Sequence, residues 1–279
     1  MFGVIIIFFS TFFDELVNSI NKAKLNQKQI SIYSLSIINY LAPAIFFIGI
    51  NIVKWQFNFS LASWPTLGTR AVVEIILTYI TFEAIAQADR STFGFVRVIT
   101  MPLLLIIDLF LGYKIKSWQL AGIGIIIFSL FLIFLLHGIK RRGAWLSLIS
   151  AVLAVITIAL YKYDITYYNS VAAEQTIIYI ILLAFLSGLA FFKAKENPFS
   201  FFRQKTFCFL SLINIVPSFL NSYAYTFAPA SVILSAYRSS AVFWSMISGK
   251  VYFKEKHFLI KMLYLTLLII GIVLLAINY

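Results

Sequence analysis

The sequence predicts an all-α integral membrane protein with ten transmembrane helices, arranged as two inverted five-helix repeats. Three observations lead to this fold class. Hydrophobic residues make up 62% of the chain and charged residues 11%, whereas soluble domains average about 45–50% and about 25%. The apolar residues fall into ten segments, each near the roughly 20 residues that cross a bilayer. Polar residues recur at a spacing of about half the chain length.

In chain order, the connections between these segments are short, and none has room for a soluble domain. The longest are 54–66 and 193–205, where Pro65 and Pro198 interrupt the helices. The predicted helices lie at 2–21, 32–53, 67–88, 91–111, 118–138, 144–163, 170–192, 206–227, 230–252 and 259–278.

The two halves of the chain align when shifted by about 140 residues. Aligned pairs include Lys22 with Lys162, Glu74 with Asn214, and Lys114 with Lys254. The alternative is that apolar segments align by chance at many shifts. A basic stretch at 138–143 divides the chain into repeats at 1–139 and 140–279. Because each repeat holds five helices, an odd number, the second must enter the membrane from the opposite side.

The charge distribution agrees with a membrane protein and argues against a nucleic-acid partner. The formal net charge is +12, but the cations lie between apolar segments, as expected of loops near anionic headgroups. Most loop cations follow odd-numbered helices, which places those loops in the cytoplasm and both termini outside. We expect the first segment to be a retained span, because Asp14 and Glu15 stand where a cleavage signal needs small residues.

Motifs of soluble enzymes are missing from the sequence. It contains no phosphate-binding loop of the G-x-x-x-x-G-K-[ST] type, no nucleophile elbow and no His/Cys/carboxylate cluster of metal-ligand spacing. The single cysteine, Cys208, cannot form an internal disulfide. We therefore expect no enzymatic activity, no cofactor and no bound metal.

Polar residues within the predicted spans are the candidate binding residues, because such groups are expensive in lipid and usually face a bundle interior or a wet cavity. Arg97 and Arg238 lie about two turns into the fourth and ninth helices. Two guanidinium groups at equivalent depth suit a carboxylate or phosphate of a substrate. The alternative is that each pairs with a helix carboxylate or snorkels to the interface. Tyr237 adds a ring and a hydroxyl beside Arg238.

Acidic and amide side chains supply the other half of the candidate site. Glu74 is either a cavity carboxylate or the local ion-pair partner of Arg70, four residues earlier. On the eighth helix, Asn214 and Asn221 belong to one polar stripe, which indicates a pore-facing or helix-facing surface. In the first helix, Asp14 and Asn18 share a face. Either at least one of the adjacent acids Asp14 and Glu15 faces the interior, or the helix is tilted and both reach the headgroups.

The end of each half resembles the EamA-like family of the drug/metabolite transporter superfamily. Repeats of that family end with a proline-bearing helix, a short turn, and a helix with spaced glycines. The matching residues are Met101-Pro102, Leu111-Gly112-Tyr113-Lys114 and Ala121-Gly122-Ile123-Gly124 in the first half, and Tyr252-Phe253-Lys254-Glu255 and Ile270-Gly271-Ile272 in the second. The first half lacks the turn acid, and the second lacks the proline. The resemblance implies a central cavity lined by helices one, three, four, six, eight and nine, and both termini in the cytoplasm, opposite to the charge count.

We therefore expect a secondary transporter that moves a small polar or zwitterionic metabolite, such as an amino acid or S-adenosylmethionine, by alternating access. A coupling proton or a counter-substrate would drive it. The alternatives are a nucleotide-sugar exchanger of the same superfamily, or a membrane enzyme or scaffold that transports nothing. The expected location is the bacterial inner or plasma membrane, as a monomer or homodimer in contact with the lipid bilayer.

Overall fold

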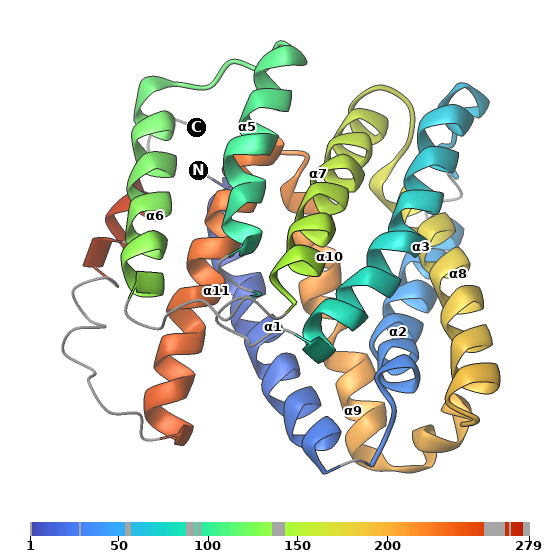
Figure 1. Ribbon diagram of the computed structural model, residues 1–279. Helices are drawn as coiled ribbons and strands as arrows, with labels where there is room; N and C mark the ends of the chain where they lie inside the picture. Colours follow the sequence, from blue (N-terminus) through green and yellow to red (C-terminus); the bar gives the residue numbers. More distant parts are fainter. Residues whose placement is uncertain are drawn as a thin grey trace. The chain divides into compact units, whose positions relative to one another are not determined.

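The computed structural model describes residues 2–27, 29–53, 57–87, 93, 96–135, 143–253, 266–267 and 269–275. Nearly all of them are helical, and no strand occurs among them. The α-helices labelled in Figure 1 are α1 (Phe2–Asn26), α2 (Ile32–Val53), α3 (Trp64–Gln87), α5 (Thr100–Phe110), α6 (Ser117–Leu135), α7 (Ala144–Tyr167), α8 (Val171–Gly188), α9 (Lys205–Ile213), α10 (Ile215–Ala224) and α11 (Ala230–Phe253). Shorter turns are η1 (Leu61–Ser63), η2 (Arg97–Ile99), η3 (Leu189–Lys193) and η4 (Pro198–Arg203).

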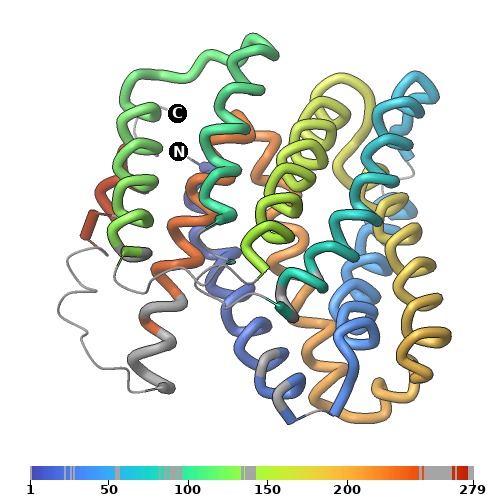
Figure 2. The backbone as a smooth tube through the Cα atoms, in the orientation of Figure 1, coloured from blue at the N-terminus to red at the C-terminus, as the bar shows by residue number. Residues whose placement is uncertain are grey.

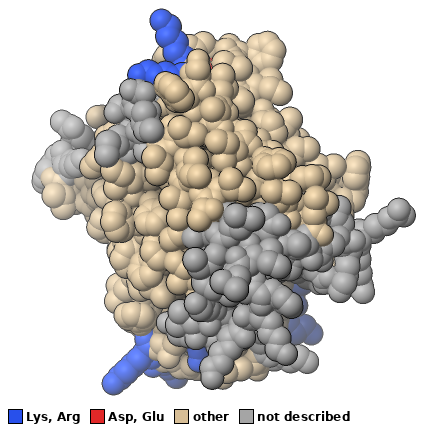
Figure 3. Space-filling model, turned by 90° about the vertical axis from the view of Figure 1, so that its left-hand side faces the viewer, with Lys and Arg blue, Asp and Glu red and all other residues tan. Residues whose placement is uncertain are grey.

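Each of the ten predicted segments contains helix in the structure. By length and composition, five of the described helical stretches could cross a membrane: Phe2–Leu25, Ile32–Val53, Ala144–Tyr167, Val171–Lys193 and Lys205–Ala224. On the face drawn in Figure 3, the described Lys and Arg side chains gather near the top and the bottom, and the described surface between them is mostly of other residue types. The predicted helical character is therefore confirmed for the described residues, and the five long apolar helices support the predicted membrane character.

Two prolines explain local departures from regular helix. Pro217 lacks an N–H to donate to the carbonyl four residues earlier, at Ile213, and the helix predicted at 206–227 is interrupted at Asn214 between α9 and α10. Pro43 lies inside α2 and leaves the carbonyl of Asn39 without its usual helical donor. The Asn214 amide fills that gap, because its Nδ2 donates to the Asn39 carbonyl at 2.8 Å.

The chain forms two compact units, each built from both halves of the sequence. Unit 1 comprises Met1–Phe12, Ile76–Ala159 and Ala224–Tyr279, and unit 2 comprises Phe13–Ile75 and Leu160–Tyr223. The sequence segments of each unit can be followed by residue number in Figure 2. The two segments of unit 2 begin 147 positions apart and end 148 positions apart. Each unit therefore contains segments from both halves of the sequence.

In unit 1, α11 packs against α5 and α6. The apolar core includes Met101, Ile126 and Ile233, with Val4 and Ile7 from the first turns of α1. Another close approach joins α6 to the helical residues 269–275. A Cβ placed on Gly122 would lie 2.9 Å from the Gly271 carbonyl oxygen, so these two segments meet backbone to backbone.

In unit 2, α2 is the central helix and packs against α8 and α9. Phe47 and Tyr179 belong to the core between α2 and α8, and Phe207 and Leu210 of α9 pack with Leu35 and Ile38 of α2. A further cluster joins α3 to α8 through apolar side chains: Leu67, Ala71, Ile178 and Leu182. These apolar contacts surround the polar side chains that form the candidate site.

Candidate functional site

A buried ion pair between Arg70 of α3 and Glu174 of α8 lies at the centre of the polar residues of unit 2. Arg70 Nη1 is 2.7 Å from Glu174 Oε1, and the two side chains are 7% and 0% exposed. Ser170 caps α8 by accepting from the Ala173 N–H, which places Glu174 in the first turn. A carboxylate is favoured there by the exposed N–H groups of the helix.

The loop between α7 and α8 completes the surroundings of Glu174. Asn169 donates from Nδ2 to Glu174 Oε2 at 2.7 Å and accepts from the Ser60 N–H at 3.0 Å. On the last turn of α7, Asp164 is fully buried and accepts from the Thr66 hydroxyl. Two carboxyl groups and one guanidinium are therefore gathered where α3, α7 and α8 meet.

Tyr161 connects this cluster to α10. Its ring lies 4.5 Å from the Arg70 guanidinium carbon, a cation–π distance, and its hydroxyl donates to the Ser222 carbonyl at 2.9 Å. Gln175 Nε2 also reaches α10, donating to Ser222 Oγ at 2.9 Å. Side chains of α7 and α8 therefore connect the Arg70–Glu174 ion pair to α10. Such a hydrogen-bonded network holds the charged groups in fixed positions.

A second acidic position lies in the middle of α1. Asp14 Oδ2 accepts from Asn221 Nδ2 of α10 at 3.0 Å, and both side chains are only half-buried. Tyr179 of α8 lies within electrostatic range of Asp14 and of Glu74 on α3. Tyr40 of α2 stacks on Tyr179 with ring centroids 5.6 Å apart. Besides the Arg70–Glu174 pair, unit 2 thus contains two further acids, an amide and two phenol rings that interact with one another.

In unit 1, the predicted cationic residues lie on α11 and just before α5. Arg97 begins η2, with its guanidinium 5.0 Å from the ring of Phe93. Arg238 lies on α11, with its guanidinium 5.8 Å from the ring of its neighbour Tyr237. Both arginines are half-buried. Aromatic rings therefore face both cations within unit 1.

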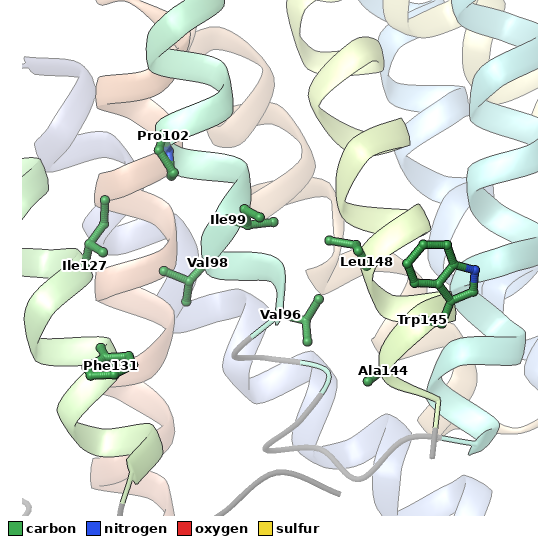
Figure 4. Close-up of a pocket in the computed structure, with 9 residues that line it drawn as sticks. All are labelled: Val96, Val98, Ile99, Pro102, Ile127, Phe131, Ala144, Trp145 and Leu148. Carbon is green, nitrogen blue, oxygen red and sulfur yellow. The ribbon is translucent and has the colours of Figure 1, made fainter. Parts of the chain in front are cut away.

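Unit 1 also contains an apolar pocket of about 490 Å³. As Figure 4 shows, it is lined from η2, α5, α6 and the start of α7, and Trp145 stands at one side. The lining residues are Val96, Val98, Ile99, Pro102, Ile127, Phe131, Ala144, Trp145 and Leu148. Such a lining suits a hydrocarbon chain better than a charged metabolite.

The predicted site residues fall into both units. Unit 2 holds five of them, and unit 1 holds Arg97, Tyr237 and Arg238. Within unit 2, Asp14 and Asn221 are brought together, Asn18 is exposed on α1, and Asn214 is engaged with the α2 backbone. The unit 2 members are Asp14, Asn18, Glu74, Asn214 and Asn221.

Sequence reasoning missed Glu174, Asp164 and Tyr161. Glu174 lies four residues after Ser170, at the start of an apolar run, where a capped helix with an acid in its first turn could have been anticipated. No sequence signal identifies Asp164, because its partners come from distant segments. Among the described residues, no group of three or more His, Cys, Asp or Glu side chains could hold a metal ion.

No family model matches the sequence, and no curated protein matches it. The fold itself has a counterpart among solved structures. A protein known from its crystal structure superposes with a TM-score of 0.73 at 10% sequence identity, and the match covers 99% of both chains. The fold of this chain is therefore similar to one already observed by crystallography.

Proposed function

We propose that this chain is a secondary transporter that moves a small polar or zwitterionic metabolite across a membrane by alternating access. The observation that carries the proposal is the hydrogen bond between Asp14 and Asn221. It joins an acid in the middle of an apolar helix of the first half to an amide of the second half. An ionisable group at such a position is costly in lipid and marks a substrate or ion path.

The proposal includes ten spans in two inverted repeats, similar to the EamA-like family. Helices that the repeat pairs with each other pack together within each unit: α2 with α8, α5 with α11, and α6 with residues 269–275. Elements next to a twofold axis meet their own equivalents in this way. Two loop contacts also agree with ten spans that place successive loops on alternate sides of the membrane. Ser170 donates its N–H to the Asn58 carbonyl, and Ser31 donates its N–H to Glu196, so each contact joins two loops expected on one side.

The charges of the candidate residues suit a substrate with both signs of charge. Asp14 and Glu74 would attract an ammonium group or a coupling proton, and Asn221 would donate a neutral hydrogen bond. Arg97 and Arg238 would bind a carboxylate or phosphate, with Tyr237 beside them. An amino acid, S-adenosylmethionine or a nucleotide sugar carries such groups, and no nucleic acid is involved. The bilayer of a bacterial inner or plasma membrane would surround a monomer or homodimer.

Reconstituted protein tests this proposal. Ligands would first be found by thermal shift with amino acids, S-adenosylmethionine and nucleotide sugars, since a ligand that binds only the folded state raises the melting temperature. Uptake into proteoliposomes would then be compared for the wild type, Asp14→Asn and the neighbouring-acid control Glu15→Gln. We expect at least tenfold slower uptake for Asp14→Asn and near wild-type uptake for Glu15→Gln. Equal uptake by all three proteins would remove Asp14 from the site.

Arg97→Ala and Arg238→Ala test the cationic candidate residues of unit 1 in the same assay. A folded variant that loses uptake of anionic or zwitterionic solutes supports the transporter. A scaffold would tolerate both changes, and a membrane enzyme would convert the solute instead of accumulating it. Analysis of the vesicle contents by mass spectrometry separates these outcomes.

A further inference from the structure

The polar cluster at the junction of α3, α7 and α8 contains two carboxyl groups but one guanidinium group. Asp164 and Glu174 are both fully buried, and among the described residues the cation in an ion pair here is Arg70, which binds Glu174. Lys162 stands two positions before Asp164 on α7, and residues two apart on a helix do not face each other. With both carboxyls ionised, the cluster would carry a net charge of −1 in a region from which water is excluded. Such an uncompensated charge is strongly unfavourable.

The hydrogen bonds of the two carboxyl groups account for three of their four oxygens. Glu174 accepts from Arg70 at Oε1 and from Asn169 at Oε2. Asp164 accepts from Thr66 at Oδ1, but its buried Oδ2 has no donor. Thr66, which donates to Asp164, lies three residues after Ser63, and the Ser63 hydroxyl accepts from the Asn169 amide that also donates to Glu174, so the two carboxyls belong to one polar cluster. Two ionised carboxylates are both acceptors, so a bond between them requires a proton on one of them.

We propose that Asp164 and Glu174 share a single proton, and that this carboxyl pair is a proton-binding site of the protein. Helix position indicates which group carries it. Glu174 is in the first turn of α8, where the helix dipole favours a negative charge, and Asp164 is in the last turn of α7, where it opposes one. The proton therefore resides mainly on Asp164, and Glu174 remains the anion that faces Arg70.

This site gives the proposed transporter a place to take up and release its coupling ion, and in this respect the inference rests on that proposed function. Chains of acids carry protons in membrane pumps and transporters. Thr66, half-buried at the start of α3, and Asn169, in the loop that follows α7, lie at the helix ends beside the pair. Tyr161 and Arg70 extend the polar contacts from the pair towards α10.

Infrared difference spectroscopy of the purified full-length protein, between acidic and alkaline pH, detects the proton directly. We expect the C=O stretching band of a buried protonated carboxyl in the wild type. Asp164→Asn should abolish this band yet keep the fold, because its amide can donate to Glu174 in place of the proton. Glu174→Gln should also abolish it, since Asp164 then becomes the only anion near Arg70. The control Glu15→Gln should retain it.

Each other outcome overturns the proposal. Absence of the band in the wild type, or its persistence in Asp164→Asn, removes the proton from this pair. Loss in Asp164→Asn alone identifies a lone protonated aspartate and refutes sharing. Because the spectra need no substrate, the proton site is decided even if the protein transports nothing. If the wild type does transport, collapsing the pH gradient should slow uptake by the wild type and not by Asp164→Asn; an unchanged wild-type rate would refute the coupling role.

Discussion

Arg70 brings a full charge into the apolar interior of unit 2, and its stability there depends on Glu174 and Tyr161. Arg70→Met would leave the Glu174 carboxylate buried without its cation, a loss of about 3–5 kcal/mol in unfolding free energy. The double variant Arg70→Met/Glu174→Gln should recover part of this loss, because no charge is then stranded. Reversible unfolding in mixed micelles measures all three values.

The matched control for this experiment is Arg203→Met, which removes an exposed arginine from η4. A surface change of this kind is expected within about 0.5 kcal/mol of the wild type. If Arg70→Met were no more destabilising than Arg203→Met, the ion pair would contribute nothing measurable to the fold.

Glu196, in the loop after η3, ties that loop to the start of α2. Burial by itself would raise the pKa of Glu196, but donation by the Ser31 N–H and the Ser34 hydroxyl outweighs it and holds the pKa below its ordinary value of about 4.5. A lowered folded-state pKa stabilises the fold above the unfolded pKa, and this stability is lost as pH falls through the folded value. The wild type should therefore melt above Glu196→Gln at neutral pH.

Below about pH 4.5, this difference in melting temperature should shrink as the wild-type carboxylate becomes protonated. Thermal melts of both proteins across that pH range provide the measurement. A constant difference would show that the negative charge of Glu196 does not contribute.

At the scale of elements, glycines set how closely α6 approaches the helical residues 269–275. A Cβ on Gly271 would lie 2.5 Å from Ile126 Cγ1 and 3.1 Å from the Gly122 carbonyl oxygen. Gly271→Ala should therefore destabilise the protein by about 1–3 kcal/mol through overpacking. Gly124→Ala is the control on α6, because a Cβ there meets nothing within 4 Å. Chemical unfolding of the two variants tests this, and equal stabilities would mean that the segments can move apart freely.

Asn214 and Pro43 form a compensating pair between the α9–α10 break and α2. Asn214→Ala leaves the Asn39 carbonyl without its side-chain donor, which should cost about 1–3 kcal/mol. In a Pro43→Ala background the restored N–H of residue 43 can donate to that carbonyl, so the same Asn214→Ala change should cost much less. A double-mutant cycle on unfolding free energy gives the coupling. Additive effects would instead leave Asn214 available for substrate.

For the molecule as a whole, helix content and membrane character could be predicted because composition and apolar run length determine them locally. The tertiary partners could not. The sequence offers Glu74, one turn away, as the neighbour of Arg70, whereas Glu174 is brought to Arg70 by the packing of α3 on α8. Asn214 looks like a pore-lining amide until Pro43, far away in sequence, is seen to need a hydrogen-bond donor nearby. Pairings between distant segments depend on the fold, which local patterns do not specify.

The proposed ten-span topology determines which side of the membrane each loop faces. In a Cys208→Ser background, single cysteines would replace three exposed loop residues: Asn58, Lys114 and Lys195. With ten spans, two crossings separate the first two positions, so both should react with an impermeant maleimide on the same side. Five crossings separate Asn58 from Lys195, which should label from the opposite side. The cation bias places Lys195 in the cytoplasm, so intact cells should label the first two positions only. Labelling of Asn58→Cys and Lys195→Cys from one side would mean an even number of crossings between them and would end the inverted-repeat interpretation.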